Sequence, residues 1–204
     1  MAIAVSACEG SAPPKAVRPH APGMVLADDI PIAHTPKGGY GVAFPKPILT
    51  ACTEPLAKGA PDLRGVWRTL RAQRAGKPAP AGDRIWDYAE RIEQCGDRIV
   101  DMGGGTIADA RATGAARDGV HDVSFRDFKT PITATASYER GVFVLRPGFV
   151  GWLPVGLARI QVTRQLDADG HMIWTRPDMG HQTVVLERIG GPNDAYTIHR
   201  HPGP

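Results

Sequence analysis

The chain has 204 residues, of which 42% are hydrophobic, and its formal net charge is only +3. This composition supplies enough apolar material for a core and excludes a wholly disordered chain. Basic residues are interspersed with acidic ones, so the basic stripe typical of nucleic-acid-binding proteins is missing. The 24 glycines and 19 prolines argue against a helical bundle and for a chain rich in turns. No apolar run approaches the roughly 20 residues of a membrane-spanning helix.

The first residues resemble the export signal of a bacterial lipoprotein. Val5-Ser6-Ala7-Cys8 is similar to a lipobox, in which small residues precede the cysteine that receives the lipid, and a Gly/Ser/Pro stretch follows like a tether. The apolar part of a working signal is about 7–15 residues long, so we expect Met1 to lie inside a longer signal. We interpret 1–23 as the end of a signal and a flexible tether. The alternative is an ordinary apolar N-terminus with a free cysteine.

The other two cysteines, Cys52 and Cys95, are far apart in the chain and form no CxxC pattern. In an exported protein they would form one disulfide, whereas in a cytosolic protein they would be two buried thiols. Their spacing argues against a zinc site, and the histidines show no ligand pattern. We therefore expect neither a metal nor a cofactor.

Residues 24–61 are expected to form an extended arm. Prolines recur too often in this segment for a long helix or a regular strand. Apolar side chains such as Ile30, Ile32, Val42 and Phe44 indicate that the arm packs on the domain that follows.

From residue 62 onward, short runs of alternating polar and apolar residues are separated by turn sequences, which predicts a succession of hairpins. About eight strands or slightly more in residues 62–190 favour an antiparallel up-and-down β-barrel, which removes its own sheet edges. Residues 191–204 would be a C-terminal tail. The expected strands lie at 65–73, 91–95, 98–100, 106–111, 131–138, 142–146, 159–166, 171–175 and 182–189.

Gly65-Val66-Trp67 resembles the G-x-W pattern that opens the first barrel strand of the calycins, the superfamily of lipocalins and avidins. The resemblance covers about 62–190. It implies that Trp67 plugs the closed end of the barrel and that a basic residue of the last strand, here Arg188, lies over its ring. Bacterial lipocalins are often lipoproteins, which agrees with the interpretation of Cys8.

Arginines follow apolar residues near the ends of two predicted strands. Arg146 is in phase with Val142 and Val144, and Arg164 is in phase with Val162. If the apolar faces point inward, Arg146 and Arg164 would enter the barrel, where fatty-acid-binding proteins use arginine to hold a ligand carboxylate. The alternative is that both side chains reach solvent from the strand ends.

The segment 147–157 is more apolar than a solvated loop and contains Phe149, Trp152 and Leu153. Such a segment would cover the mouth of the barrel, touch a membrane or bind a partner. The alternative is that it packs against the arm as ordinary core.

These observations favour an exported barrel, anchored by lipid at Cys8 on the periplasmic face of a bacterial membrane, that binds a small hydrophobic or amphipathic molecule, including an anionic one. Without a functional lipobox the protein would be cytoplasmic. No nucleic acid is expected as a partner, membrane contact is expected only through the anchor, and the oligomeric state stays open.

Two other classes of function remain. A small-barrel isomerase or cyclase would use Asp101, Asp109 or His121 as an acid or base. A structural or protein-interaction barrel would have a core filled by its own side chains. A cavity of at least about 300 Å³ would favour binding or catalysis over the structural class. A titratable group buried in that cavity would favour catalysis.

Overall fold

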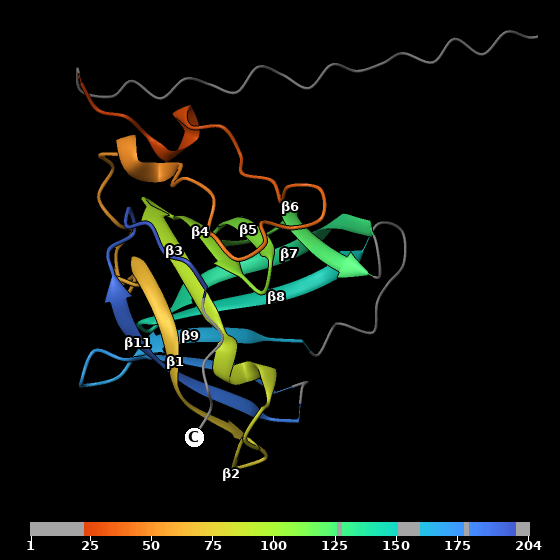
Figure 1. The fold of residues 1–204 in the computed structure, drawn as a ribbon. Coiled ribbons are helices and arrows are strands. Elements are labelled where there is room, and N and C mark those ends of the chain that lie inside the picture. The colour runs from red at the N-terminus through yellow and green to blue at the C-terminus, as the bar shows by residue number, and fades with distance from the viewer. Residues whose placement is uncertain (1–22, 126–127, 151–159, 178–179, 199–204) are drawn as a thin grey trace, which may run out of the picture.

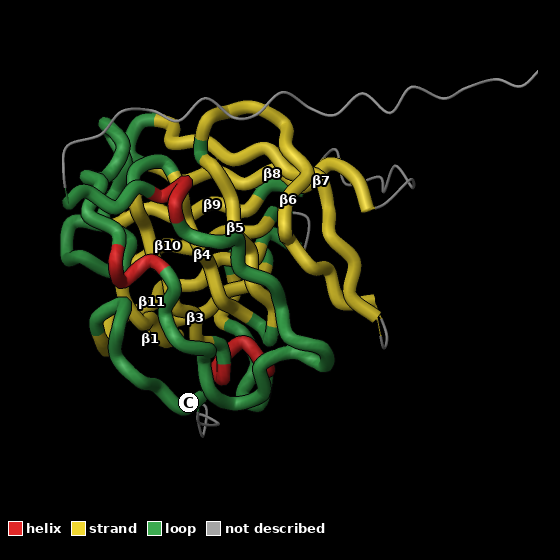
Figure 2. The backbone as a smooth tube through the Cα atoms, turned by 90° about the horizontal axis from the view of Figure 1, so that it is seen from above, coloured by secondary structure: helices red, strands yellow, loops and turns green. Residues whose placement is uncertain are grey.

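The computed structural model describes residues 23–125, 128–150, 160–177 and 180–198. The described chain is all-β, and its strands form one antiparallel sheet that curls into a nearly closed barrel (Figures 1 and 2). The predicted barrel class is confirmed, but the predicted count of about eight strands or slightly more is wrong. Eleven strands are present in the described residues.

Ten strands follow one another around the barrel in the order β5-β4-β3-β1-β11-β10-β9-β8-β7-β6, and β2 pairs only with β1. The described residues contain three short 3-10 helices, η1 (Ala27–Asp29), η2 (Leu49–Ala51) and η3 (Arg84–Asp87), and no helix among them has the length and apolarity to cross a bilayer. The strands are β1 (Gly65–Arg74), β2 (Lys77–Pro78), β3 (Ala89–Cys95), β4 (Arg98–Gly103), β5 (Thr106–Arg111), β6 (Thr113–Phe125), β7 (Phe128–Glu139), β8 (Val142–Val150), β9 (Val162–Leu166), β10 (Met172–Arg176) and β11 (Gln182–Gly190).

Most predicted hairpins are present with their turns in the expected places. β3 pairs with β4 around Gly96, and β7 pairs with β8 around Gly141. Both glycines have positive φ angles, 56° and 82°, a conformation that costs glycine little and other residues more. Local turn chemistry is therefore sufficient to place these hairpins.

Strand β6 was missed because its sequence does not alternate. It pairs with β7 in a register that shifts between Thr113 and Ala116 and again between Asp118 and His121. A bulge moves the side chains that follow it to the opposite face of the sheet. A strand with two such shifts shows no regular two-residue period.

The arm covers the outer face of β3, β4 and β5, as the orange and red segments over these strands show in Figure 1. Cys52 and Cys95 are joined as a disulfide that attaches the arm to the end of β3, with Cα atoms 6.2 Å apart. The expectation that Ile32 and Val42 are buried is wrong, since they are 60% and 65% exposed. A second hydrophobic cluster, separate from the barrel core, consists of Ala27, Ala33, Leu49, Cys95, Val100, Met102 and Ile107.

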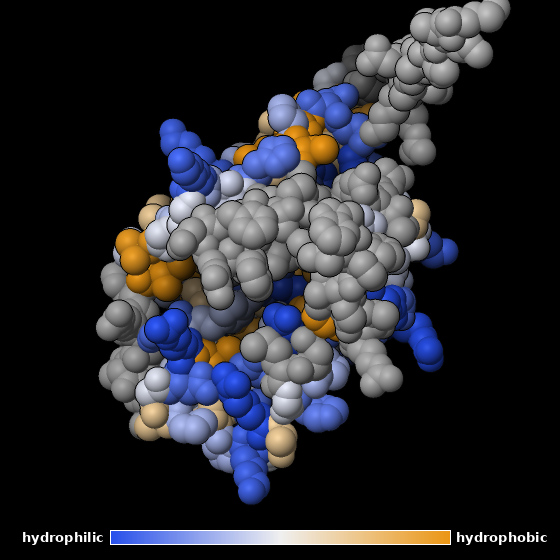
Figure 3. All heavy atoms as spheres, turned by 90° about the vertical axis from the view of Figure 1, so that its right-hand side faces the viewer, coloured by the Kyte–Doolittle hydropathy of each residue, from blue (hydrophilic) through white to orange (hydrophobic). Residues whose placement is uncertain are grey.

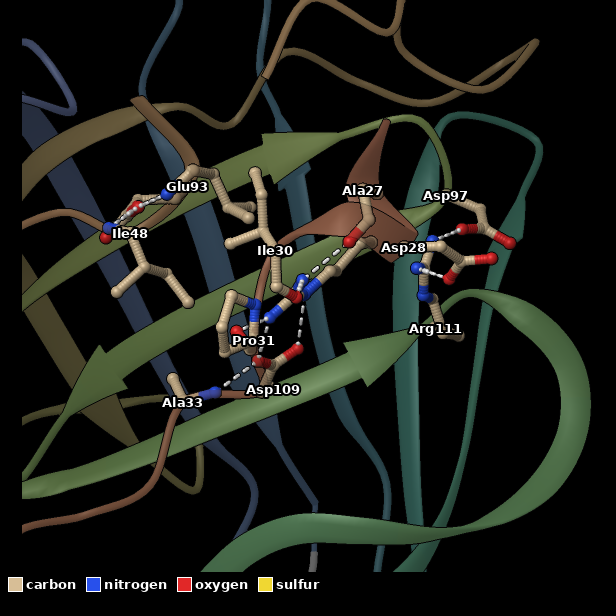
Figure 4. Close-up of polar contacts among 12 residues, drawn as sticks. Ala27, Asp28, Ile30, Pro31, Ala33, Ile48, Glu93, Asp97, Asp109 and Arg111 are labelled. Atoms are coloured by element: carbon tan, nitrogen blue, oxygen red, sulfur yellow. Dashed lines mark hydrogen bonds and ion pairs between the residues drawn. The ribbon is translucent and has the colours of Figure 1, made fainter. Parts of the chain in front are cut away.

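Buried charged side chains of the barrel hold the backbone of the arm (Figure 4). Asp109 accepts a 2.8 Å hydrogen bond from the N–H of Ala33 and pairs with Arg98 at 2.7 Å. The guanidinium of Arg98 also donates 2.7 Å hydrogen bonds to three arm carbonyl oxygens, those of Ala27, Ile30 and Pro31. The bonds to the arm reach main-chain groups, so they define the path of the arm independently of its side chains.

Two charged residues of β3 make the same kind of contact farther along the arm. Glu93 accepts hydrogen bonds of 2.8 Å from the N–H groups of both Ile48 and Leu49. Arg91 donates to the carbonyl oxygen of Pro45. The arm is thus held by contacts from side chains to its backbone at two places, residues 27–33 and residues 45–49.

The arm also caps the outer edge of β5. The hydroxyl oxygen of Thr35 accepts a 2.9 Å hydrogen bond from the N–H of Ile107, and that of Tyr40 accepts one of 3.2 Å from Gly105. An open strand edge can pair with another chain. The arm therefore protects this edge.

The described surface mixes polar and apolar residues. On the face shown in Figure 3, hydrophilic residues surround small, separate hydrophobic groups. This distribution agrees with the interspersed charges of the sequence.

Candidate functional site

At one end of the barrel Trp67 lies beneath Arg188. Trp67 is fully buried, and the guanidinium carbon of Arg188 lies 4.7 Å from the centroid of its ring. The two residues are direct partners in the β1–β11 pairing. The indole N–H of Trp67 donates to the carbonyl oxygen of Leu63 at 2.8 Å, and Arg188 donates to that of Asp62 at 2.8 Å. The contact expected from the calycin resemblance is present in the structure.

The close approach of β11 explains why residue 65, two positions before this tryptophan, is a glycine. Its φ angle is +143°, and a Cβ atom there would lie 2.8 Å from the carbonyl oxygen of Gly190 and 3.2 Å from the side-chain stem of Arg188. Contacts of 2.8 Å to backbone are too short for a carbon atom. Only glycine lets β11 and the arginine approach β1 this closely.

Inside the barrel Arg164 joins β9 to β3 and β4 across the interior. Its Nε and Nη2 atoms donate to Glu90 at 2.9 and 3.1 Å, and Nη2 also donates to Asp101. The three side chains are 4%, 0% and 9% exposed. The structure places Arg164 in the barrel, as expected, but bound to two carboxylates of the chain itself. We call Arg164, Glu90 and Asp101 the ionic cluster.

Aromatic rings surround the ionic cluster. Trp174 and Phe143 are the direct strand partners of Arg164, and the guanidinium carbon lies 5.9 Å from the centroid of the Phe143 ring. Tyr88 lies 5.9 Å from Trp174 between ring centroids and donates its O–H to Glu90 at 2.5 Å. Burial in such surroundings strengthens electrostatic interactions and makes unpaired polar groups costly.

Tyr88 also lines a surface groove, so it lies between the groove and the ionic cluster. Gly103 makes room for it, since a Cβ atom at Gly103 would lie 2.6 Å from the Tyr88 hydroxyl. The groove has a volume of about 570 Å³ and is lined by Gly41, Gly82, Arg84, Asp87, Tyr88, Ala89, Gly104, Gly105 and Ile198.

The ionic cluster contains two carboxyl groups and one guanidinium group. Burial raises the pKa of Asp101 to about 7, an effect that Arg164 opposes and Glu90 reinforces. Burial alone would lower the pKa of Arg164, but Asp101 and Glu90 outweigh it and keep that pKa above its usual range. Arg164 therefore stays charged, and Asp101 exchanges its proton near neutral pH.

Arg164, its bonded partner Asp101 and its strand partner Trp174 each have one buried polar atom without a hydrogen-bond partner among the described residues. They are Nη1 of Arg164, Oδ1 of Asp101 and Nε1 of Trp174. Buried polar atoms are nearly always paired, and an unpaired one costs about 1–3 kcal/mol. The barrel interior thus offers two donors and one acceptor.

Two predicted site residues lie outside the barrel interior. Arg146 pairs with Glu139 at 2.7 Å and is 40% exposed, so the prediction that it points inward is wrong. Phe143 and Leu145 take the inward positions of β8, which turns the intervening side chains outward. Asp109 faces the arm on the outer side of β5 rather than a cavity.

The structure describes less of the remaining predicted residues. His121 is on β6 opposite Ile132, and Phe149 is on β8 opposite Thr133, while their side chains are not among those described. Trp152, Leu153 and Cys8 lie outside the described residues.

Sequence reasoning missed Tyr88, Glu90 and Trp174. Glu90 shares a strand face with Ile92 and Gln94, and this alternation was the available signal that Glu90 faces inward. No comparable local signal exists for Tyr88, because its contact with the cluster depends on how β3 crosses the barrel.

Two groups in the described residues bring three ligand-type atoms within 4.8 Å of one another. One group contains the disulfide cysteines with Glu54. The other is the β9–β10 turn with Asp167, Asp169 and His171. In this turn Asp167 already accepts backbone hydrogen bonds from both other residues, which accounts for the grouping.

No protein-family model matches the chain, and a comparison with curated proteins finds no match. The geometry of the barrel interior is therefore the basis for a function.

Proposed function

We propose that this chain is a calycin-like barrel that binds a small, largely apolar molecule between the groove and the ionic cluster. The observation that supports this most is the set of buried, unpaired polar atoms on Arg164, Asp101 and Trp174. A barrel filled only for stability would be expected to pair such atoms within the chain. The groove of about 570 Å³ exceeds the lower limit of about 300 Å³ for ligand pockets.

Tyr88 is the side chain that a ligand passes on its way inward. It touches the groove, Glu90 and Trp174. The rings of Tyr88, Trp174 and Phe143 supply apolar walls, and the unpaired polar atoms supply orientation. This combination of many apolar contacts with few polar ones is typical of small-molecule sites.

Native mass spectrometry of protein purified from its own host tests the proposal. We expect a co-purified small molecule in the wild type and less of it in Trp174→Phe, which removes one unpaired N–H and keeps an aromatic ring. Tyr138→Phe is the matched control, because the Tyr138 hydroxyl already has a partner in Gln94. Equal occupancy in both variants, or protein without any bound molecule, would contradict the proposal.

Export and lipid anchoring form a second part of the proposal, supported by Val5-Ser6-Ala7-Cys8. Expressed from its genomic locus in its own host, the wild type is expected to take up a clickable fatty acid. Cys8→Ala should not. Equal labelling of both proteins would refute the anchor and leave the binding site unaffected.

Acid–base catalysis is the second candidate function, favoured by the position of Asp101. This carboxyl group is buried in the ionic cluster with a pKa of about 7, which suits a general acid or base near neutral pH. Incubation with the co-purified molecule distinguishes the two functions. A catalyst changes the mass or isomeric form of that molecule, and Asp101→Asn stops the change, whereas a binding protein returns it unaltered.

A further inference from the structure

The unpaired polar atoms of the ionic cluster and of Trp174 restrict which polar group a bound molecule can place beside them. Arg164 and Trp174 are opposite each other on β9 and β10, and each has one buried donor nitrogen without a partner in the described residues, Nη1 with two N–H groups and Nε1 with one. Asp101, which is bonded to Arg164, has one free oxygen acceptor. A ligand that satisfies all three atoms must both accept and donate hydrogen bonds.

A carboxylate head group does not match this site. Arginine usually holds a carboxylate through two parallel N–H bonds. Here Nε and Nη2 of Arg164 are already bonded to Glu90 and Asp101, which leaves only Nη1. A third carboxylate would also add negative charge next to two existing carboxylates in a buried environment, where repulsion is strong.

An ammonium head group matches the charge but not the hydrogen bonds. It has three donors and no acceptor. It would satisfy Asp101 and leave the unpaired N–H groups of Arg164 and Trp174 as they are. Buried donors without an acceptor disfavour such a complex.

We infer that the barrel interior selects a molecule with an uncharged head group that both accepts and donates hydrogen bonds, of which a primary carboxamide is the simplest. The carbonyl oxygen has two lone pairs, which serve the N–H groups of Arg164 and Trp174. The amide nitrogen donates to Asp101. An apolar tail extends past Tyr88 toward the groove. This inference rests on the proposed function, because it specifies the ligand of the same site.

Three probes of equal chain length test the inference: octanamide, octanoate and octylamine, titrated into the full chain and followed by tryptophan fluorescence and calorimetry at pH 8. We expect octanamide to bind at least about tenfold more tightly than either charged probe, since each charged probe leaves buried groups unpaired. In Asp101→Asn, which removes one negative charge, octanoate should gain at least about tenfold relative to octanamide.

Glu139→Gln is the matched control for charge. It removes one negative charge from an exposed pair on the outer face, so the preference among the probes should stay that of the wild type. Should Asp101→Asn fail to fold, the comparison of the three probes on the wild type is decisive by itself.

The outcomes separate the two claims. Octanoate or octylamine binding as tightly as octanamide overturns the head-group inference and leaves ligand binding in the barrel intact. Failure of all three probes to bind, together with no co-purified molecule, overturns both.

Discussion

Removal of the Arg98 guanidinium should release the arm from the barrel. Arg98 is 2% exposed, and it makes two hydrogen bonds to Asp109, at 2.9 and 2.7 Å, besides three to arm carbonyl oxygens. Arg98→Met keeps an unbranched stem and none of these bonds. Breaking a buried ion pair by removing one partner costs about 3–5 kcal/mol, because the other charge stays buried without compensation. We expect a loss of this size in the free energy of unfolding.

A second variant shows where that loss comes from. In Arg98→Met/Asp109→Leu the stranded carboxylate is gone, so the double variant should be more stable than Arg98→Met by about 1–3 kcal/mol. The recovery is partial, because Asp109 also accepts the hydrogen bond from the N–H of Ala33.

Urea denaturation measures the stability, and amide hydrogen exchange measures the arm directly. The N–H of Ala33 should exchange much faster in Arg98→Met than in the wild type. Arg146→Met, at an exposed pair, serves as the control and should cost at most about 1 kcal/mol. A cost below about 1 kcal/mol for Arg98→Met, or unchanged protection of Ala33, would refute the reasoning.

Three further predictions concern the barrel plug, the ionic cluster and the disulfide. In urea denaturation, Trp67→Ala should lower the free energy of unfolding by about 3–5 kcal/mol and Arg188→Ala by about 1–2 kcal/mol. The double variant should show a coupling energy of at least about 0.5 kcal/mol between the two residues, and strictly additive losses would exclude a direct contact. Burial raises the pKa of Asp101 from 3.8 to about 7, so the folded chain retains a proton that the unfolded chain releases. Stability should therefore fall as the pH rises from about 4 to about 7, and a wild type minus Asp101→Asn difference that is flat with pH would contradict this. Reduction of the Cys52–Cys95 bond, which closes a loop of 43 residues, should cost about 4 kcal/mol in the chain-entropy account, and two freely alkylatable thiols in the oxidised folded protein would show that the bond does not form.

Charged residues on the outer face of β3 to β5 show where sequence reasoning reaches its limit. No sequence pattern shows that Glu93, Arg98 and Asp109 are buried beneath the arm, because charged residues are rarely buried unless paired. Their partners are backbone groups of the arm, which are more than 40 residues away in sequence. No local pattern contains that information.

For strand β8 too, the sequence does not show which face of the strand points into the barrel. Val142, Phe143, Val144 and Leu145 are all apolar, so alternation assigns neither face to the core. Closure of the barrel decided it: Phe143 pairs with Arg164 on the inner face, and Arg146 was thereby left outside.

The sequence by itself determined the β class and most hairpins, because these depend on turn residues and on two-residue periodicity. The Trp67–Arg188 contact was implied by the calycin resemblance, and it joins two strands that barrel closure brings together. Only the tertiary structure decided which faces point inward, that Arg164 meets Glu90 and Asp101, and that the arm caps β5. Each of these depends on atoms brought together across the barrel or from the arm, and the energy of burying a charge is set by such distant partners rather than by sequence neighbours.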